Sequence, residues 1–523
     1  MSDISVLIVG AGPAGSTLAI ELARRNVSCR VIDRAGGPTI TSRAFTVHAR
    51  TLEQLEAVGL VESFLSRGLV STSMDYRFPG VDKVARLDFT QLRDTHYPFI
   101  LINNQNATEA LLRAHLSSMN VPVEWGTALR EFTVDPAGGV TATLVRSDGG
   151  SEVVHAEWLV GCDGLRSTVR KKLELGFAGD EYAGHMRMMD VPLHGFPLAD
   201  NRIHYLHGEG RMVLVTKLPG VNYRVLISEL GGSAITDIEV AQAEFQQALD
   251  EHFGGAVEVG VPEWTTRFVL WKRLSAAFRR GPVLLCGDAG HIHSPAGGMG
   301  LNAGMGDAFN LGWKLAALVN GDAHPVLLDS YEAERRPIAA QVIEATDMLH
   351  QVIMAHDRPM EERIAIAEAP GFNDRAVARI SGLAHSYRHT MRAPGGLEGP
   401  AVGDRAPNVA LDARTSVHDL LHHTDYTLLV IHHSPRSAWE HAALPARVAQ
   451  RFGDRIRVTV ISSPGRAGAP SNTLITDTDR IHNLYGTPNS AAACLIRPDG
   501  HIAARVPLAE FGRALADLET VLT

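Results

Sequence analysis

Three glycines near the N-terminus, Gly10, Gly12 and Gly15, restrict the fold of the first forty residues more than any other feature. They follow a short β-branched run, residues 4–9, that is suited to a buried parallel strand. In such a unit the first glycine permits a tight turn, the second lets a pyrophosphate approach the backbone, and the third lets a helix pack on the strand. The helix is expected over about residues 14–25, with its N-terminal N–H groups facing the phosphates.

The next strand ends in an acidic residue. It includes Val31 and Ile32 and stops at Asp33, 18 residues after Gly15. A carboxylate at that place can accept hydrogen bonds from a ribose diol. The strand, the helix, the second strand and the terminal acid follow one another in the order and at the spacing of a dinucleotide-binding unit. The ligand is therefore expected to contain ADP, as FAD or NAD(P). The residues expected to bind it around this turn are Gly10, Gly12, Pro13, Ala14, Gly15, Asp33 and Arg34.

Two later stretches favour FAD over a nicotinamide cofactor. An apolar strand before Asp163 is followed by Gly164 and a basic segment that begins a helix. A further strand, residues 283–286, ends in Gly287 and Asp288, which can present a carboxylate to a ribityl or ribose hydroxyl. A glycine-rich loop comes next. Apolar residues then recur at helical spacing, at Leu301, Met305, Ala308, Leu311, Leu315 and Leu318.

The same loop contains two patterns that could indicate other sites. His291 and His293, with Asp288, could bind a divalent ion, but residues two apart on an irregular loop do not define a ligand set. No metal is therefore expected, and both histidines are expected to pack and form hydrogen bonds. Residues 298–303 match a second dinucleotide pattern, but they begin a dozen residues after the preceding strand, which disfavours a second site.

Composition limits the classes of function. A chain of 523 residues should form two to four domains. The net charge of −9, without a basic block, argues against nucleic acid as a partner. No CxxC pair occurs, so a disulfide framework is not expected. No charged leader and no run of 18 apolar residues occur either, so neither a signal peptide nor a membrane span is expected. A cytoplasmic location is therefore expected.

Three motifs can now be named: GxGxxG at residues 10–15, DG at residues 163–164 and GD at residues 287–288. Together they resemble the motifs of the class A flavoprotein monooxygenases, the aromatic hydroxylases that include 4-hydroxybenzoate hydroxylase and phenol hydroxylase. The motifs occur here in the family's order, and the resemblance covers about residues 1–400. Residues 41–60 and 103–116 also resemble family segments. The resemblance implies an α/β fold with a split Rossmann-like FAD-binding domain, an inserted antiparallel β-sheet substrate domain and a thioredoxin-like C-terminal domain.

The domain boundaries follow from this resemblance and from composition. The FAD-binding domain is expected over residues 1–179 and 276–395, and the substrate sheet over residues 180–275 with a contribution from 71–100. A Gly- and Pro-rich linker is expected at 392–411 and the tail domain at 403–523. The tail has residues 434–437, Ser-Pro-Arg-Ser, where a thioredoxin carries CxxC. Without a thiolate pair the tail is expected to be structural or to form a dimer surface, so a homodimer stays open.

The resemblance also assigns flavin contacts. Arg43 resembles the arginine near the flavin and its phosphates, and Gln105 the glutamine near the ribityl chain. Asp288 is expected at the ribityl or ribose hydroxyls, and Asp163 at its own turn or at the transient nicotinamide cofactor. The residues expected at the ring edge are Pro295, Gly298, Gly300, Leu301 and Asn302. The arginines that could reach a phosphate or lie on helix surfaces are Arg113, Arg166 and Arg170.

The substrate side is less defined. A strand-rich region, residues 202–228, offers His204, Tyr205, Arg211, Met212, Tyr223 and Arg224 as candidates to face a cavity. Because side chains alternate along a strand, about half of these should point away. A tyrosine or histidine beside a phenol could assist its deprotonation. The candidate catalytic residues are therefore Arg43, His204, Tyr205 and Tyr223.

The function implied by the resemblance is hydroxylation of an aromatic, phenolic small molecule. Hydride from NADPH or NADH would reduce FAD, O2 would add at flavin C4a, and the hydroperoxide would transfer one oxygen atom to the ring. Two alternatives remain at this point. The same scaffold can support Baeyer–Villiger oxidation or epoxidation, and an intact FAD site could also belong to a non-catalytic flavin-binding redox sensor.

Overall fold

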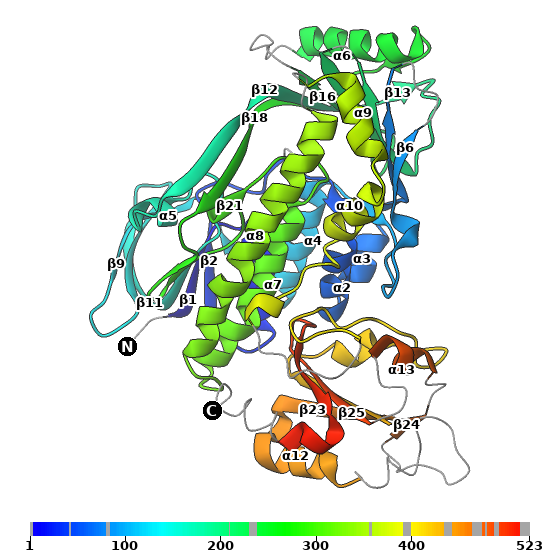
Figure 1. The fold of residues 1–523 in the computed structure, drawn as a ribbon. Coiled ribbons are helices and arrows are strands. Elements are labelled where there is room, and N and C mark those ends of the chain that lie inside the picture. The colour runs from blue at the N-terminus through cyan, green and yellow to red at the C-terminus, as the bar shows by residue number, and fades with distance from the viewer. Residues whose placement is uncertain are drawn as a thin grey trace.

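A computed structural model of the chain shows three regions, which Figure 1 colours in sequence order. A first sheet and its helices lie between a second sheet, at the top of the view, and the C-terminal domain at the bottom. The structure describes residues 4–40, 43–79, 84–208, 210–229, 238–354, 358–390, 399–432, 442–462, 473–475, 479–485 and 491–512.

The first sheet is built on the predicted strand–turn–helix–strand unit. Its strands lie in the order β19 (Arg279–Arg280), β20 (Val283–Leu285), β11 (Ser151–Gly161), β1 (Ile4–Val9), β2 (Cys29–Ile32) and β8 (Val123–Glu124). The ladder of β20, β11, β1, β2 and β8 is parallel. A hairpin of β9 (Thr127–Val134) and β10 (Val140–Arg146) extends from β11. The carboxyl ends of β1, β11 and β20 therefore meet at one edge, where the three motifs follow.

Helices cover this sheet and join its separated halves. They are α1 (Pro13–Ala23), α2 (Ala49–Ala57), α3 (Val61–Leu65), α4 (Gln105–Ser118), α5 (Thr168–Lys172), α7 (Gly300–Val319) and α8 (Val326–Ile353). α1 and α7 pack closely because Gly312 has no side chain: a Cβ there would lie 2.4 Å from the Cβ of Glu21. Leu18, Leu311 and Leu315 belong to the apolar core between these helices.

The second sheet is mixed rather than purely antiparallel. Its strands lie in the order β21 (His291–Ile292), β18 (Trp264–Ser275), β12 (Phe177–Val191), β16 (Tyr223–Glu229), β15 (Arg211–Lys217), β14 (Arg202–His207), β5 (Ser73–Arg77) and β6 (Ala85–Asp88). β5 pairs with β14 in parallel, which corrects the expected antiparallel sheet. The reason is that β5 reaches the sheet from a distant part of the chain and not through a hairpin.

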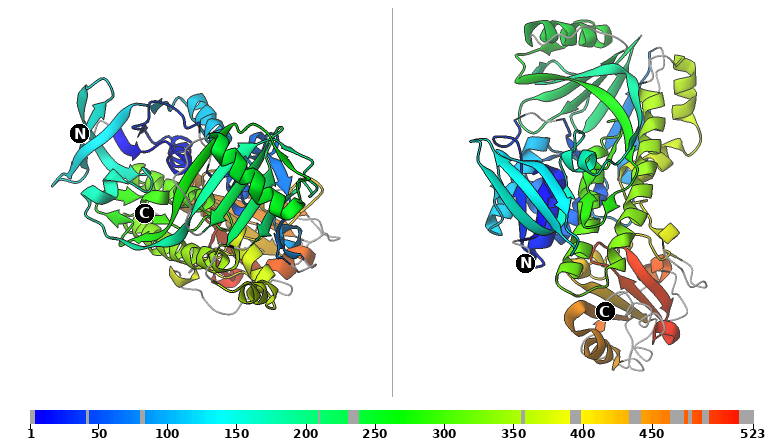
Figure 2. Two further views of the ribbon diagram at one scale, coloured as in Figure 1. Left: turned by 90° about the horizontal axis from the view of Figure 1, so that it is seen from above. Right: turned by 90° about the vertical axis from the view of Figure 1, so that its left-hand side faces the viewer.

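The two faces of the second sheet pack against different partners. The outer face carries Val213, Val215 and Val225, which pack against α6 (Ile238–Phe253). The inner face carries Met186, Met188 and Leu214, which belong to a core shared with α8, α9 (Met360–Glu368) and α10 (Phe372–Ile380). In the right-hand view of Figure 2, this sheet lies above the first sheet, and long helices lie beside both. Smaller ladders join β3 (Thr46–Val47), β7 (Ile100–Ile102) and β4 (Leu69–Ser71), and β13 (Leu193–His194) with β17 (Glu258–Val259).

The C-terminal domain has its own mixed sheet. Its strands lie in the order β24 (Thr473–Ile475), β23 (Ile456–Ser462), β22 (Tyr426–His432), β25 (Ala492–Ile496) and β26 (Ile502–Pro507). β22, β23 and β24 are parallel, whereas β25 and β26 form the predicted hairpin around Gly500. Its helices are α12 (Leu444–Phe452) and α13 (Asp479–Tyr485). Cys494 is buried in this sheet, and residues 434–437 lie outside the described residues.

The expected linker is anchored where the structure describes it. Residues 391–398 lie outside the described part of the chain. Beyond them, Arg405 binds Glu53 of α2, with 2.7 Å between Nε and Oε2. The backbone N–H of Gly403 also donates to the carbonyl of Ile502 at 2.8 Å. Residues 399–411 are therefore bound to both neighbouring regions.

Buried charges join the tail hairpin to α7 and α8. Glu334 of α8 accepts two hydrogen bonds from Arg497, at 2.6 and 2.9 Å, and one from Lys314 of α7 at 2.7 Å. Burial raises the pKa of Glu334, but Arg497 and Lys314 outweigh it and lower that pKa to about 2. Burial lowers the pKa of Lys314 to about 8, although Glu334 opposes this change. Oppositely charged partners therefore compensate each other inside this junction.

No helix within the described ranges is long and apolar enough to span a bilayer.

The junction predicts a loss of stability in acid. The pKa of Glu334 is 4.5 as a reference and about 2 when folded. A carboxyl whose folded pKa is lowered stabilises the protein above about pH 4.5, and this contribution is lost as the pH falls toward 2. A difference of this size corresponds to on the order of 3 kcal/mol. The free energy of unfolding, measured by denaturant titration between about pH 3 and pH 7, should depend less on pH in Glu334→Gln than in the unmodified protein.

Glu361→Gln, on the exposed side of α9, is the matched control and should keep the pH dependence of the unmodified protein. Equal pH dependence in Glu334→Gln and the unmodified protein would contradict the ionised state of Glu334 in the junction.

Candidate active site

A cavity of about 460 Å³ lies between the carboxyl edge of the first sheet and the inner face of the second. Segments far apart in the sequence line it: the turn after β1, residues 43–46, the loop after β20, the start of α7 and several strands of the second sheet. The cavity therefore joins the predicted dinucleotide turn to the predicted substrate sheet.

The dinucleotide turn has the geometry expected from its glycines. Gly10 has a φ of +107°, and a Cβ there would lie 2.4 Å from the carbonyl oxygen of Cys162. A Cβ on Gly15 would lie 1.9 Å from the carbonyl oxygen of Gly10, so the helix and strand approach too closely for a side chain. At Gly12 a Cβ would meet no atom within 4 Å and would enter the cavity edge. Pro13 and Ala14 line the cavity beside it, at the N-terminus of α1.

The acid after β2 is held against the turn. Asp33 Oδ2 accepts a hydrogen bond from the N–H of Ala11 at 2.9 Å, and Oδ1 accepts from Ala35 at 2.9 Å. Its carboxylate is half-buried, so each oxygen can still accept a second hydrogen bond. Arg34 is exposed next to it. Neither residue lines the large cavity, which begins at Gly12.

The GD motif places a carboxylate in the cavity. Asp288 lies in a 3-10 turn, Gly287–Ala289, directly after β20, and its side chain opens onto the cavity. The carboxyl lies deep in the protein, so desolvation raises its pKa, while the charges of His291 and Arg43 oppose this change. A hydroxyl-rich chain that lay along the cavity would meet this carboxylate.

The loop after the GD motif ends at the N-terminus of α7. Pro295, Gly298, Gly300 and Leu301 line the cavity, and α7 has no side-chain cap on its first turn. Free N–H groups at the start of a helix favour a negative charge by about 0.3–1 kcal/mol, and up to about 2 kcal/mol where partly buried. Asn302 does not line the cavity.

Local hydrogen bonds hold this loop in place. The Asn302 side chain donates to the carbonyl of Thr46 at 3.0 Å and accepts from the N–H of His48 at 2.8 Å. Gly298 has a φ of +64°, and a Cβ there would lie 2.2 Å from Oγ1 of Thr46. A side chain at position 298 would therefore collide with Thr46 and displace the loop.

Arg43 and Gln105 meet at the cavity wall. Gln105 Oε1 accepts hydrogen bonds from the N–H groups of Arg43 and Ala44, at 3.3 and 3.2 Å. The guanidinium of Arg43 is exposed to the cavity region and lies 5.6 Å from the ring centroid of Phe268. Gln105 thus fixes the backbone of the residue whose charge faces the cavity.

The other charged candidates of the sequence have structural partners. Asp163 Oδ2 accepts from the N–H groups of Thr168 and Val169, at 2.6 and 3.2 Å, and so caps α5. Arg170 is buried, donates to the carbonyls of Ala289 and Leu165, and is thus not a free phosphate partner. Arg166 is exposed, and Arg113 pairs with Glu109 on α4 at 3.4 Å.

The two histidines of the loop bind different partners. His291 Nε2 donates to Asp307 at 2.8 Å, and His293 Nδ1 donates to the carbonyl of Ser294 at 2.9 Å. Burial lowers the pKa of His293 to about 4, so its ring is neutral near pH 7. Among the described residues, the group with metal-ligand spacing lies elsewhere, at the surface, and consists of Glu56, Asp419 and His422.

The strand candidates divide between the two faces of the second sheet. Tyr205 lines the cavity and stacks on Tyr76, with ring centroids 4.9 Å apart. His204 faces the other way and bonds the carbonyl of Ala199, and Tyr223 donates to Asp200 on the same outer side. The expectation that His204 and Tyr223 act at the cavity is thus wrong, because alternation along β14 and β16 points them outward.

The remaining three candidates also have defined places. Arg211 pairs with Glu251 of α6 on the outer face. Met212 and Arg224 are on the inner face, but neither lines the cavity. Arg224 is fully buried and forms two hydrogen bonds of 2.8 Å to Asp190.

Sequence reasoning missed most of the apolar wall. This half of the cavity is lined by Met74, Met186, Met188, Ile203, Leu214, Leu226, Phe268, Leu270, Trp271 and Met354. The alternation of Met186 with Met188 and of Phe268 with Leu270 is the signal that could have indicated it. Methionine side chains adapt to irregular aromatic shapes, so this wall suits a flat apolar ligand.

The arrangement fits FAD. The open side of Gly12, the uncapped starts of α1 and α7, and the Asp288 carboxylate lie along one cavity. Gly12 and the start of α1 suit a pyrophosphate, and the start of α7 suits the edge of a flavin ring. Asp288 suits the hydroxyl chain that joins the two. The apolar wall then lies beyond the place for the ring.

Comparisons with known proteins agree. Residues 3–346 match the family model of the FAD binding domain, and residues 399–523 match that of the aromatic-ring hydroxylase C-terminal region. The chain is 39% identical over 511 residues to pentachlorophenol 4-monooxygenase of Sphingobium chlorophenolicum, covering 97% of this chain and 94% of that protein. It is 34% identical over 529 residues to 6-methylpretetramide 4-monooxygenase of Streptomyces rimosus, covering 96% and 90%.

A solved structure shows the same fold along the whole chain. The anhydrotetracycline hydroxylase OxyS of Streptomyces rimosus superposes with a TM-score of 0.77 at 30% sequence identity, covering 99% of each chain. The resemblance inferred from the three motifs is thus confirmed. The chain belongs to the class A flavin monooxygenases and is an FAD-dependent aromatic-ring hydroxylase that carries the family's C-terminal domain.

Proposed function

We propose that this hydroxylase uses NADPH or NADH and O2 to add one oxygen atom to a phenolic small molecule. The observation that carries the proposal is the continuity of the cavity, which runs from the Gly12 turn, past Asp288 and the start of α7, to the methionine-rich wall. The relative that is 39% identical is named for its action on a chlorinated phenol. Baeyer–Villiger oxidation and epoxidation are the alternatives on the same scaffold, and the turnover assay below distinguishes the first of them from hydroxylation.

The proposed FAD contacts follow the cavity. Gly10, Gly12, Pro13, Ala14 and Gly15 would bring the N-terminus of α1 to the pyrophosphate, with Asp33 and Arg34 near the ribose. Arg43 and Gln105 would lie beside the ring and the ribityl chain, and Asp288 would accept from a ribityl hydroxyl. Pro295 and the N–H groups of Gly300 and Leu301 would meet the ring edge, where Gly298 shapes the loop. Asn302 would act from behind them, through its hydrogen bonds to His48 and Thr46. Asp163 would act through its helix cap.

Bound FAD supplies the exchange of electrons with the nicotinamide and O2. The protein's own residues position the reactants and exclude water. The start of α7 would stabilise negative charge at the ring edge, and the apolar wall would hold the aromatic ring of the substrate in a dry site. Tyr205 and Arg43, which both line the cavity, would contact a phenolic hydroxyl at this wall.

We also propose the domain division that the sequence suggested, with residues 1–179 and 276–395 for FAD, 180–275 for the substrate sheet and 403–523 for a thioredoxin-like tail. The tail's parallel strands followed by an antiparallel hairpin support that fold. Its role would be structural, and its charged contacts with α7 and α8 support this role.

A substitution at the turn tests the FAD placement. Gly12→Val would place a side chain where the pyrophosphate approaches, so FAD affinity should fall by about ten-fold or more, a loss of at least about 1.4 kcal/mol. The flavin absorbance of the purified protein, relative to its protein content, measures the loss. Gly208→Val, in the turn after β14, is the control, because a Cβ there meets only ordinary contacts. Full flavin content in Gly12→Val would refute the placement.

Two tyrosines on the same sheet test the substrate wall. Tyr205→Phe removes a hydroxyl from the cavity, whereas Tyr223→Phe removes one from the outer face. Loss of one hydrogen bond to substrate should lower kcat/KM for the phenol by about 2- to 10-fold in Tyr205→Phe. Tyr223→Phe should stay within about 2-fold in the same assay. The opposite order of effects would place the substrate on the other face.

Turnover is the test of the reaction itself. Oxidation of NADPH or NADH should be slow without substrate and much faster with the correct phenol, because the substrate would favour one conformation of the site. The product should carry one oxygen atom from isotopically labelled O2, detected by mass spectrometry. Insertion of oxygen beside a ketone would indicate Baeyer–Villiger chemistry. Product formed without a nicotinamide would exclude the proposed reaction, and no turnover across a panel of phenols would exclude a phenol as the substrate.

A further inference from the structure

A buried polar stripe runs along one side of α7. Its polar side chains, Asp307, Asn310 and Lys314, are spaced three and four residues apart, so they share one face of the helix. Ala303, four residues before Asp307, contributes its carbonyl to the same face. This face turns toward α8 and the tail hairpin, because Lys314 and Asn310 both bind Glu334 of α8. The first turn of the same helix lines the proposed flavin site.

Asp307 holds the GD loop from behind. Its Oδ2 accepts from the N–H of Gly287 at 3.1 Å and from His291 Nε2 at 2.8 Å. Gly287 directly precedes Asp288, the carboxylate that opens onto the cavity. Burial alone would favour protonation of Asp307, but Arg335 and His291 outweigh it and lower the pKa of its carboxyl. An ionised side chain therefore ties both ends of the GD turn to α7.

Arg335 continues this chain away from the flavin site. Its Nε donates to Asp307 Oδ1 at 2.7 Å, Nη2 to the carbonyl of Ala303 at 3.2 Å, and Nη1 to the hydroxyl of Tyr387 at 3.1 Å. Tyr387 is 2% exposed. Each of the three guanidinium nitrogens thus donates a hydrogen bond, two of them to α7 and one to Tyr387.

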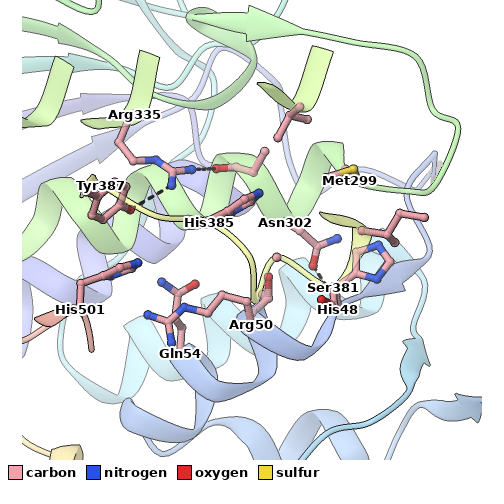
Figure 3. A pocket seen from close by; sticks show the side chains of 16 residues that line it. His48, Arg50, Gln54, Met299, Asn302, Arg335, Ser381, His385, Tyr387 and His501 are labelled. Atoms are coloured by element: carbon pink, nitrogen blue, oxygen red, sulfur yellow. Dashed lines mark hydrogen bonds between the residues drawn. The ribbon is translucent and has the colours of Figure 1, made fainter. Parts of the chain in front are cut away.

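The tail hairpin meets the other side of Tyr387. The ring of His501 lies 4.3 Å from the ring of Tyr387, centroid to centroid, and the guanidinium of Arg497 lies 5.2 Å from the same ring. Asp499, in the same turn, accepts from Asn310 of α7 at 3.3 Å. Figure 3 shows Arg335, Tyr387 and His501 along one side of a small cavity.

That small cavity borders the first turns of α7. It has a volume of about 30 Å³, and Met299, Asn302, Ala303 and Gly306 line it from the first turns of α7. Neighbouring residues of the same turns line the flavin cavity on the opposite side. The space is enough for about one or two water molecules. Beside this space, the hydrogen bonds from Arg335 to the carbonyl of Ala303 and from Asn302 to the carbonyl of Thr46 help to hold these turns in position.

We propose that the tail turn, residues 497–501, positions the flavin-binding loop through the chain of contacts from Tyr387 to Arg335 and Asp307. The tail would thereby tune the affinity of the protein for FAD and the reduction potential of the bound flavin. This inference rests on the proposed placement of FAD along Asp288 and α7. Tyr387 and Arg335 are positioning residues in this account, because they act through Asp307 and do not touch the cavity that holds the flavin.

Tyr387→Phe is the sharpest variant, because it keeps the ring against His501 and removes only the acceptor for Arg335. Without this contact, the guanidinium of Arg335 would be held less firmly against Asp307 and would neutralise its charge less well. The GD loop would then be less ordered, and the electrostatic potential around it would be more negative. We expect the Kd for FAD to rise by about 3- to 30-fold. We also expect a more negative reduction potential, because reduced flavin carries negative charge. Fluorescence titration of apoprotein with FAD and a dye-linked redox titration measure the two quantities.

Tyr485→Phe is the matched control. Tyr485 is also a fully buried tyrosine next to the tail sheet, but its hydroxyl donates to the carbonyl of Pro407, at 2.9 Å, within the C-terminal region. It should leave both the Kd and the potential unchanged. Asp499→Asn acts from the tail turn itself, and it should shift both quantities in the same direction as Tyr387→Phe.

The possible outcomes separate this inference from the proposed function. Unmodified protein that binds no FAD would refute the proposed function. If it binds FAD, then Tyr387→Phe and Asp499→Asn with unchanged Kd and potential would overturn the inference. Equal shifts in Tyr485→Phe and Tyr387→Phe would overturn it as well, because a general loss of stability would then account for both.

Discussion

The buried carboxylate of Asp307 is the interaction on which the site depends most. It binds the GD loop through Gly287 and His291, and it binds α8 through Arg335. α7 is therefore fixed at the same time to the loop that offers Asp288 and to the helix that carries the tail contacts. Removing one partner of such a buried charge pair commonly costs about 3–5 kcal/mol, because the remaining charge has lost its partner and is not rehydrated.

The flavin end of the site follows from short stretches of sequence. Gly10, Gly12 and Gly15 were predictable from their spacing after β1 alone. A Cβ at Gly15 would meet the carbonyl of Gly10 in the same turn, a Cβ at Gly10 would meet Cys162 after the neighbouring β11, and a Cβ at Gly12 would enter the cavity edge. Asp288 was predictable from the strand before it, because ligands of such sheets bind outside the carboxyl ends of the strands. Local geometry thus encodes this half of the site.

The substrate end depends on contacts that the sequence does not display. Tyr205 faces the cavity and His204 faces α6, and a shift of β14 by one residue against β15 would exchange them. That register comes from pairing with β15 and with β5, which lies more than a hundred residues earlier. Asp307 was missed for another reason: the apolar residues of α7 hide a polar stripe that has meaning only beside α8 and the tail. For the same reason residues 399–411 resemble a linker by composition, although Arg405 is paired with Glu53.

One cavity is proposed to hold both the flavin, at the start of α7, and the aromatic substrate, against the methionine-rich wall. A crystal structure of the protein prepared with FAD and an accepted phenol tests this most directly. We expect the pyrophosphate at the N-terminus of α1, a ribityl hydroxyl on Asp288, and the ring edge at the N–H groups of Gly300 and Leu301. The phenol should lie between the ring and Met186 or Met188. A flavin ring away from α7, or a phenol on the α6 side of the second sheet, would contradict it.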